Sequence, residues 1–126
     1  HPGEAARLLG TDIPGVEADR LASARELAAR YGCVAVLKGP ATAVATPEGY
    51  VAVSPIIAPN LAVGGSGDVL SGLLASLLAR GLSPLLAASL AVYWHGRAGE
   101  LLADAYPARG NLASEIADML PRAATE

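Results

Sequence analysis

A glycine-rich stretch, Gly64 to Asp68, carries the residues of this sequence best suited to chemistry. Three glycines and Ser66 lead directly into apolar residues at helical spacing, which predicts a loop that opens a helix. The first N–H groups of a helix lack internal partners and carry partial positive charge, and glycines let a phosphate approach them closely. Asp68 falls in the first helical turn, where a carboxylate repels a phosphate but could take a proton from a hydroxyl that attacks a phosphoryl group. The stretch therefore indicates phosphoryl transfer to a hydroxyl.

A purely structural explanation of the same stretch stays open. The helix dipole favours an acidic residue such as Asp68 near an N-terminus, and the glycines alone could form a tight turn. The apolar periodicity predicts that the helix runs from Asp68 to about Arg80 and Gly81.

A second candidate site follows a predicted strand. The continuous apolar run Cys33–Leu37 is typical of a buried, parallel strand, in which Cys33 would belong to the core. Lys38 to Thr42 follow the strand directly. Ligands of open α/β sheets bind at the carboxyl ends of strands, so Lys38 stands where a phosphate-binding cation is expected, although a solvated lysine explains it too.

The remaining elements expected from the sequence are helices and one β-hairpin. A short helix is expected over Ala5–Leu9 and ends at Gly10, whereas residues 11–15 read as a turn. Further expected elements are a helix over Glu17–Tyr31, a hairpin over 43–54, a helix from Leu85 to about Ala103, a last short helix up to Leu120 and a frayed tail over Pro121–Glu126.

Composition narrows the class of protein. The 126 residues suffice for one domain, and the net charge of −3 with a pI near 5.3 argues against a nucleic-acid partner. No apolar segment is long enough for a membrane span, and the single cysteine fits a reducing cytoplasm. Hydrophobic residues make up 52% and charged residues only 17%, so we expect the chain to bury surface against a partner, such as a second copy in a homo-oligomer.

The motifs together resemble a known family. Gly64 to Asp68 is similar to the anion hole and catalytic base of the ribokinase-like kinases. The stretches 1–4, 37–42, 64–72 and 93–99 follow the order and spacing of the NAD(P)H-hydrate dehydratases, over nearly the whole chain. The resemblance implies a ribokinase-like layered α/β/α fold, of which residues 1–126 are the C-terminal portion of a single domain. Its first half would lie before His1.

The resemblance also implies an activity and a set of site residues. These enzymes use ADP or ATP, with Mg²⁺, to dehydrate the S epimer of hydrated NADH and NADPH. By resemblance Asp68 is the catalytic base and also contacts the substrate, as does His1. Glu4 would reach the metal only through water, and no direct metal ligand is expected. The N–H groups of residues 65–67 would stabilise the transferring phosphoryl group, and the nucleotide-binding residues would be Lys38, Gly39, Pro40, Ala41, Thr42 and Gly67.

The sequence departs from the family pattern just before the glycines. The family usually has an asparagine where this chain has Ala58, and commonly a hydroxyl residue where it has Val63. Both differences affect details of the nucleotide or cation contacts.

Several polar residues near these motifs have structural explanations beside functional ones. His95 could be a metal ligand, a catalytic acid or a core histidine, and the lack of other ligands at suitable spacing favours the core. Arg97 and Glu100 are expected to make helix-surface contacts. Ser114 and Glu115 could reach the adenine side of a nucleotide or simply cap the last helix.

Two rival functions remain open. The first is a ribokinase-like kinase of a small alcohol, of the hydroxyethylthiazole or pyridoxal type, against which His1 to Glu4 argues because such kinases usually have a different polar residue there. The second is a non-catalytic nucleotide-binding fragment that acts only with a partner.

Overall fold

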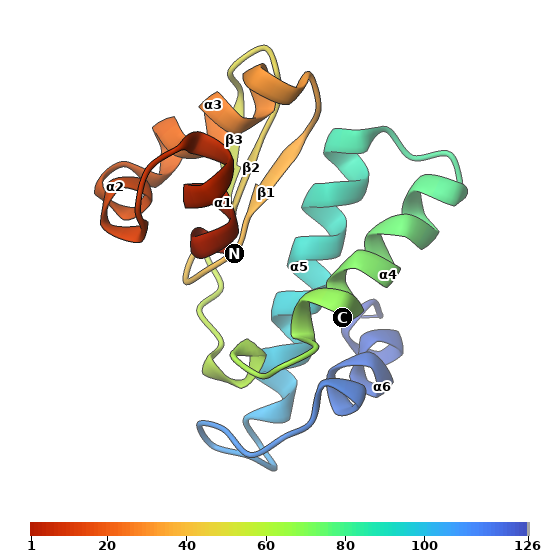
Figure 1. Ribbon diagram of the computed structural model, residues 1–126. Helices are drawn as coiled ribbons and strands as arrows, with labels where there is room; N and C mark the ends of the chain where they lie inside the picture. Colours follow the sequence, from red (N-terminus) through yellow and green to blue (C-terminus); the bar gives the residue numbers. More distant parts are fainter. Residues whose placement is uncertain (126) are drawn as a thin grey trace. The chain divides into compact units, whose positions relative to one another are not determined.

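The computed structural model describes residues 1–125 and divides the chain into two compact units, His1–Pro55 and Ile56–Glu126 (Figure 1). The helices and the small sheet give an α/β fold. None of the described helices has both the length and the hydrophobicity that crossing a bilayer requires.

The first unit places three helices before a small sheet. The helices are α1 (Pro2–Leu9), α2 (Ile13–Ala18) and α3 (Arg20–Tyr31), and the strands are β1 (Ala35–Leu37), β2 (Ala43–Ala45) and β3 (Val51–Val53). The strands pair in the order β1-β2-β3, with Leu37 opposite Ala43 and Ala43 opposite Val53. The predicted hairpin over 43–54 is confirmed, as is the end of α1 at Gly10, which adopts a left-handed conformation with φ 71°.

Several expectations for this unit are wrong. The strand begins at Ala35 and, within the described residues, pairs antiparallel, because the short connection over residues 38–42 cannot make the crossover that a parallel pair needs. Cys33 lies before the strand and is exposed. The helix expected over Glu17–Tyr31 is interrupted at Asp19, whose carboxylate accepts a hydrogen bond from the Ala22 N–H (3.0 Å) and so starts α3. The turn expected over residues 11–15 is wrong from Ile13 onward, because α2 begins there after the Asp12 carboxylate accepts from the Gly15 N–H (2.8 Å).

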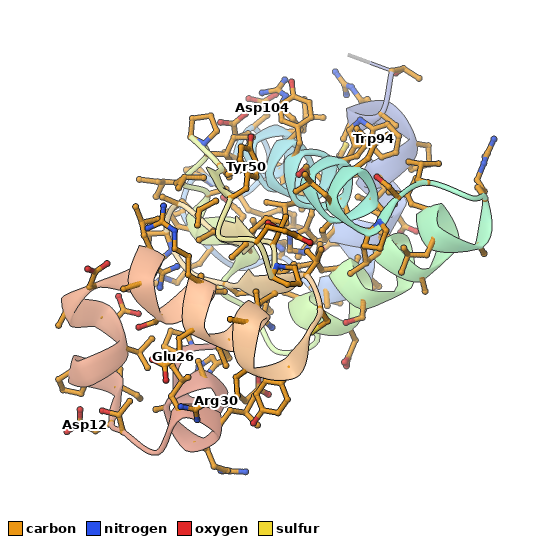
Figure 2. All side chains as sticks on the ribbon, turned by 90° about the horizontal axis from the view of Figure 1, so that it is seen from above. Asp12, Glu26, Arg30, Tyr50, Trp94 and Asp104 are labelled. Carbon is orange, nitrogen blue, oxygen red and sulfur yellow. The ribbon has the colours of Figure 1, made fainter. Side chains whose placement is uncertain are left out.

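The core of this unit lies between α3 and the sheet. α3 packs against β1 and β2, and α1 packs against α2 and α3. The opposite face of α3 is polar, and Figure 2 shows Glu26 and Arg30 side by side there, joined by an ion pair of 2.5 Å. The buried apolar residues of this core are Ala5, Ala6, Val16, Ala24, Leu27, Ala28, Leu37, Ala43 and Ala45.

The second unit is helical. It contains a 3₁₀ turn, η1 (Pro59–Leu61), and the helices α4 (Ser66–Ala79), α5 (Pro84–Leu102) and α6 (Ala113–Ala123). α5 packs against both α4 and α6 (Figure 1). The start of α5 is confirmed, because Ser83 caps it through an Oγ that accepts from the Leu86 N–H (3.3 Å).

Two glycines let the segment before the glycine loop lie against α5. A Cβ at Gly96 would come within 3.0 Å of Ile56, and a Cβ at Gly99 within 2.7 Å of Leu61. These distances explain why the sequence carries glycine twice in the middle of a helix, where it otherwise weakens the helix.

A buried pair of asparagines ties η1 to the start of α6. Asn60 Nδ2 donates to Asn111 Oδ1 (3.1 Å) and to the Tyr106 carbonyl (2.7 Å), while Asn111 Nδ2 donates back to the Asn60 carbonyl (3.1 Å). Both side chains are almost completely buried, so each satisfies polar groups of the other that water does not reach.

The frayed tail expected from Pro121 is wrong as far as Ala123. α6 continues through Pro121 to Ala123, whose side chain is fully buried against Leu102 and Ile116. Burial of the last turn offsets the hydrogen bond that proline cannot donate. The end of the predicted tail, Glu126, lies outside the described residues.

Candidate active site

The glycine loop opens α4 as the sequence predicts. Gly65 precedes the helix with a left-handed φ of 89°, and no side chain caps the helix. The Ser66 N–H donates to the Val63 carbonyl (3.1 Å), and the Asp68 N–H donates to the Gly65 carbonyl (3.1 Å). Among residues 1–125, the Gly65 and Gly67 N–H groups have no acceptor, so these two donors are available to an anion.

Asp68 follows these donors in the same turn of the chain. Asp68 is exposed in the first turn of α4, and its carboxylate makes no hydrogen bond or ion pair with any residue that the structure describes. An exposed, unpartnered carboxylate next to two free N–H groups can accept the proton of a bound hydroxyl while the N–H groups hold an anion.

His95 is a buried, hydrogen-bonded histidine, which confirms the structural interpretation. Its partner is unexpected, because its Nε2 atom lies 3.1 Å from Ser66 Oγ and 3.1 Å from the Ser66 carbonyl oxygen. In the described part of the chain, no three His, Cys, Asp or Glu side chains gather where they could hold a metal ion.

In the first unit, residues 38–42 form a tight connection between β1 and β2. Gly39 has φ 151° and Ala41 has φ 56°, a left-handed conformation that costs an alanine energy. Thr42 Oγ1 donates to the Gly39 carbonyl (3.1 Å) and closes the turn. The Lys38 ammonium makes no hydrogen bond or ion pair with any described residue, which leaves its charge available to a ligand.

Arg20 is a residue of this segment that sequence reasoning missed. Its Nη2 donates to the carbonyls of Leu37 (3.2 Å) and Lys38 (3.4 Å), and its Nη1 pairs with Glu17 (2.8 Å). A Cβ at Gly39 would lie 2.9 Å from Nη1, so Gly39 is needed for the guanidinium to pack there. From the sequence, an arginine at the start of a helix is expected to be a surface residue. Its contacts with the end of β1 become visible only once α3 is packed against the sheet.

His1 and Glu4 belong to the start of α1. His1 Nδ1 accepts a hydrogen bond from the Gly3 N–H (3.0 Å) and caps the helix, and Glu4 lies in the first turn of α1. Both side chains are exposed. His1 is thus an N-cap of α1, and its substrate role stays a prediction.

The polar residues near α6 make structural contacts. Glu115 accepts from the Leu112 N–H (2.6 Å) and from the Tyr106 hydroxyl (2.6 Å). The Tyr106 hydroxyl, followed by the Leu112 N–H, lowers the pKa of the Glu115 carboxyl, and the same hydrogen bond raises the pKa of Tyr106. Capping thus explains Glu115, and Arg97 pairs with Glu100 on α5 as expected.

A family model described as NAD(P)H-hydrate dehydratase matches residues 1–122. The chain belongs to the NAD(P)H-hydrate dehydratase family. It is 44% identical, over 96% of its length, to a bifunctional NAD(P)H-hydrate repair enzyme of Moorella thermoacetica, and 46% identical, over 93%, to an ADP-dependent (S)-NAD(P)H-hydrate dehydratase of Neisseria meningitidis. It spans 23% and 40% of the lengths of these two relatives.

A solved structure of the NAD(P)H-hydrate dehydratase family confirms the fold class. The chain matches the ADP/ATP-dependent NAD(P)H-hydrate dehydratase of Bacillus subtilis, co-crystallised with ATP and Mg²⁺, with a TM-score of 0.91 and 39% identity. The match covers 98% of this chain and 44% of the Bacillus protein.

Proposed function

We propose that the protein containing this chain dehydrates the S epimer of hydrated NADH and NADPH at the expense of ADP or ATP. One observation carries the proposal: Asp68 is exposed, makes no hydrogen bond or ion pair with residues 1–125, and follows Gly65 and Gly67, whose N–H groups have no acceptor among the same residues. Membership of the NAD(P)H-hydrate dehydratase family supplies the substrate class.

The chemistry solves a leaving-group problem. Hydroxide leaves a carbon poorly. In the proposed reaction the substrate hydroxyl oxygen attacks the terminal phosphorus of the nucleotide, the bond from that phosphorus to the bridging oxygen breaks, and Asp68 takes the hydroxyl proton. The lone pair of the ring nitrogen then expels phosphate, and loss of a proton from the neighbouring carbon restores the dihydronicotinamide.

The Gly65 and Gly67 N–H groups would stabilise the transition state electrostatically. They meet the negative charge that spreads over the phosphoryl oxygens in the transition state, and each such preorganised donor contributes about 3–4 kcal/mol. We assign nucleotide binding to residues 38–42. The Lys38 ammonium, which has no partner within residues 1–125, would contact phosphate, and Arg20 would hold the backbone of the segment.

Mg²⁺ fits this set of residues as an ion held by the nucleotide. Mg²⁺ in nucleotide sites keeps several waters and binds substrate phosphates, so phosphate oxygens and water would supply most of its coordination, with Glu4 contributing through water. When bound, the ion neutralises phosphate charge.

A direct assay tests the proposal. The full-length protein is incubated with hydrated NADH and Mg²⁺, with ADP and ATP in parallel, and the return of NADH absorbance is followed. Nucleotide-dependent recovery is expected and also identifies the donor. Folded protein that restores no NADH with either nucleotide would refute the proposal, and a stable phosphorylated small alcohol would establish the rival kinase activity.

We further propose a cytoplasmic homo-oligomer. The exposed thiol of Cys33 is compatible with a reducing compartment, and the exposed apolar side chains of Leu86 and Tyr93 on α5 offer surface to a second copy. Light scattering on the purified protein tests the oligomer, and a monomer at micromolar concentration would contradict it.

A further inference from the structure

The ring of His95 and the first residue of α4 form a buried contact in the second unit. His95 Nε2 lies 3.1 Å from both the hydroxyl and the carbonyl oxygen of Ser66, and each residue is only 7% exposed. Ser66 lies between Gly65 and Gly67, whose N–H groups have no acceptor within residues 1–125. The histidine therefore contacts the loop from behind, through the one residue of it that is buried.

The chemistry of the two oxygens fixes where the histidine carries its proton. A carbonyl oxygen can only accept a hydrogen bond, so the nitrogen that bonds to it must carry hydrogen. A bare Nε2 would instead point its lone pair at the lone pairs of the carbonyl oxygen. The contact thus requires an N–H at Nε2 that donates to both oxygens of Ser66, and the hydroxyl of Ser66 then directs its own hydrogen away from the ring.

We propose that His95 is a positioning residue of the phosphoryl-transfer loop, one that holds Ser66 and thereby keeps the N–H groups of the flanking Gly65 and Gly67 directed at the anion. The inference rests on the function proposed above. α4 has no side-chain cap and Ser66 is flanked by glycines, so little else within the loop restrains its first turn. A capping residue in the loop usually restrains the first turn of a helix. Here His95, on α5, restrains the first turn of α4 through its contact with Ser66.

The test compares four variants of the full-length protein in the hydrate-repair assay. H95L removes the N–H and S66A removes the hydroxyl. Each should lower kcat, by up to about 10²-fold, the effect of losing one preorganised donor, because the Gly65 and Gly67 N–H groups are no longer held in place, with the KM for nucleotide near its wild-type value. The double variant H95L/S66A should be no slower than the slower single variant, because both changes break the same contact. H95Q should restore most of the activity, since a glutamine places an N–H near the position of Nε2.

A matched control separates positioning from stability. Val92 lies on the same helix with the same 7% exposure, so V92A should lower thermal stability while kcat stays unchanged. If V92A lowers kcat as H95L does, or if the losses in H95L and S66A multiply in the double variant, the inference is wrong.

A measurement independent of activity distinguishes the two proposals. Nitrogen NMR of histidine-labelled protein, with the His95 signal assigned by its loss in H95Q, should show hydrogen on Nε2. An Nε2 without hydrogen overturns the inference even if the enzyme is active. A wild-type protein with no nucleotide-dependent repair instead refutes the proposed function, and with it the role of His95 that rests on it.

Discussion

A single methyl group added at Gly99 should weaken the fold at the segment that leads into the glycine loop. Gly99 is buried on α5, and a Cβ there would lie 2.7 Å and 2.8 Å from Cγ and Cδ2 of Leu61 and 2.9 Å from Cβ of Ala58. Carbon atoms do not approach so closely, so η1 or α5 must move. The Leu61 side chain can turn aside, but Ala58 moves only with its backbone.

The expected magnitude follows from two opposing effects. Overpacking of this kind costs about 1–3 kcal/mol, and the involvement of a Cβ next to the backbone places Gly99 in the upper half of that range. Alanine favours a helix over glycine by about 1 kcal/mol. The free energy of unfolding of Gly99→Ala should therefore fall by about 1–2 kcal/mol.

Gly72 on α4 is the matched control. It is also a helical glycine, but a Cβ there would meet nothing within 4 Å. Gly72→Ala should therefore raise the free energy of unfolding by about 0.5–1 kcal/mol through helix propensity alone. Chemical denaturation of both variants measures the difference. Shifts of the same sign, or a Gly99→Ala variant as stable as the wild type, would refute the packing argument.

Three further results are expected. Arg20→Lys keeps the charge but loses the fork that holds the carbonyls at the end of β1, so nucleotide affinity, measured by titration, should fall about tenfold; unchanged affinity would contradict this role. Asn60→Ala and Asn111→Ala should each lower the free energy of unfolding by about 1–3 kcal/mol, because each leaves a buried polar partner without its hydrogen bond. The double variant should lose clearly less than the sum of the two, and additive losses in chemical denaturation would refute the pairing. The hydrogen bond from Tyr106 lowers the pKa of Glu115, so it stabilises the fold at pH values above the ordinary glutamate pKa, and this stabilisation is lost as the pH falls through the pKa of the folded state. Tyr106→Phe should therefore make the thermal midpoint less sensitive to acid. An unchanged dependence of the midpoint on pH would count against the Tyr106–Glu115 contact.

Periodicity and glycine placement made much of the second unit predictable. The apolar spacing after Asp68 and the pair Ser83-Pro84 mark the starts of α4 and α5 from local chemistry alone. The residue types of the glycine loop likewise indicate an anion site, because free N–H groups depend only on the backbone.

The balance between competing effects could not be predicted from the sequence. Asp19 starts a new helix through a local hydrogen bond that outweighs the helical pattern around it, and Pro121 stays helical because tertiary contacts bury the last turn of α6. The direction of β1 depended on the length of its connection to β2, which the apolar pattern of the strand does not report.

Side-chain partnerships in the candidate site were equally hidden. Arg20 and His95 lie far along the chain from the groups that they hold, 17 and 29 residues away respectively. No spacing rule joins such positions, so only the folded chain shows that the two residues support the backbone of the predicted site.

The central claim, that Asp68 is the base of phosphoryl transfer, is tested most directly by Asp68→Asn in the full-length protein. The amide keeps the shape of the carboxylate and removes its basicity. With saturating hydrated NADH, nucleotide and Mg²⁺, kcat should fall by about 10²–10⁴-fold while nucleotide binding, measured by titration, stays intact. Turnover near the wild-type rate would show that Asp68 is not the base.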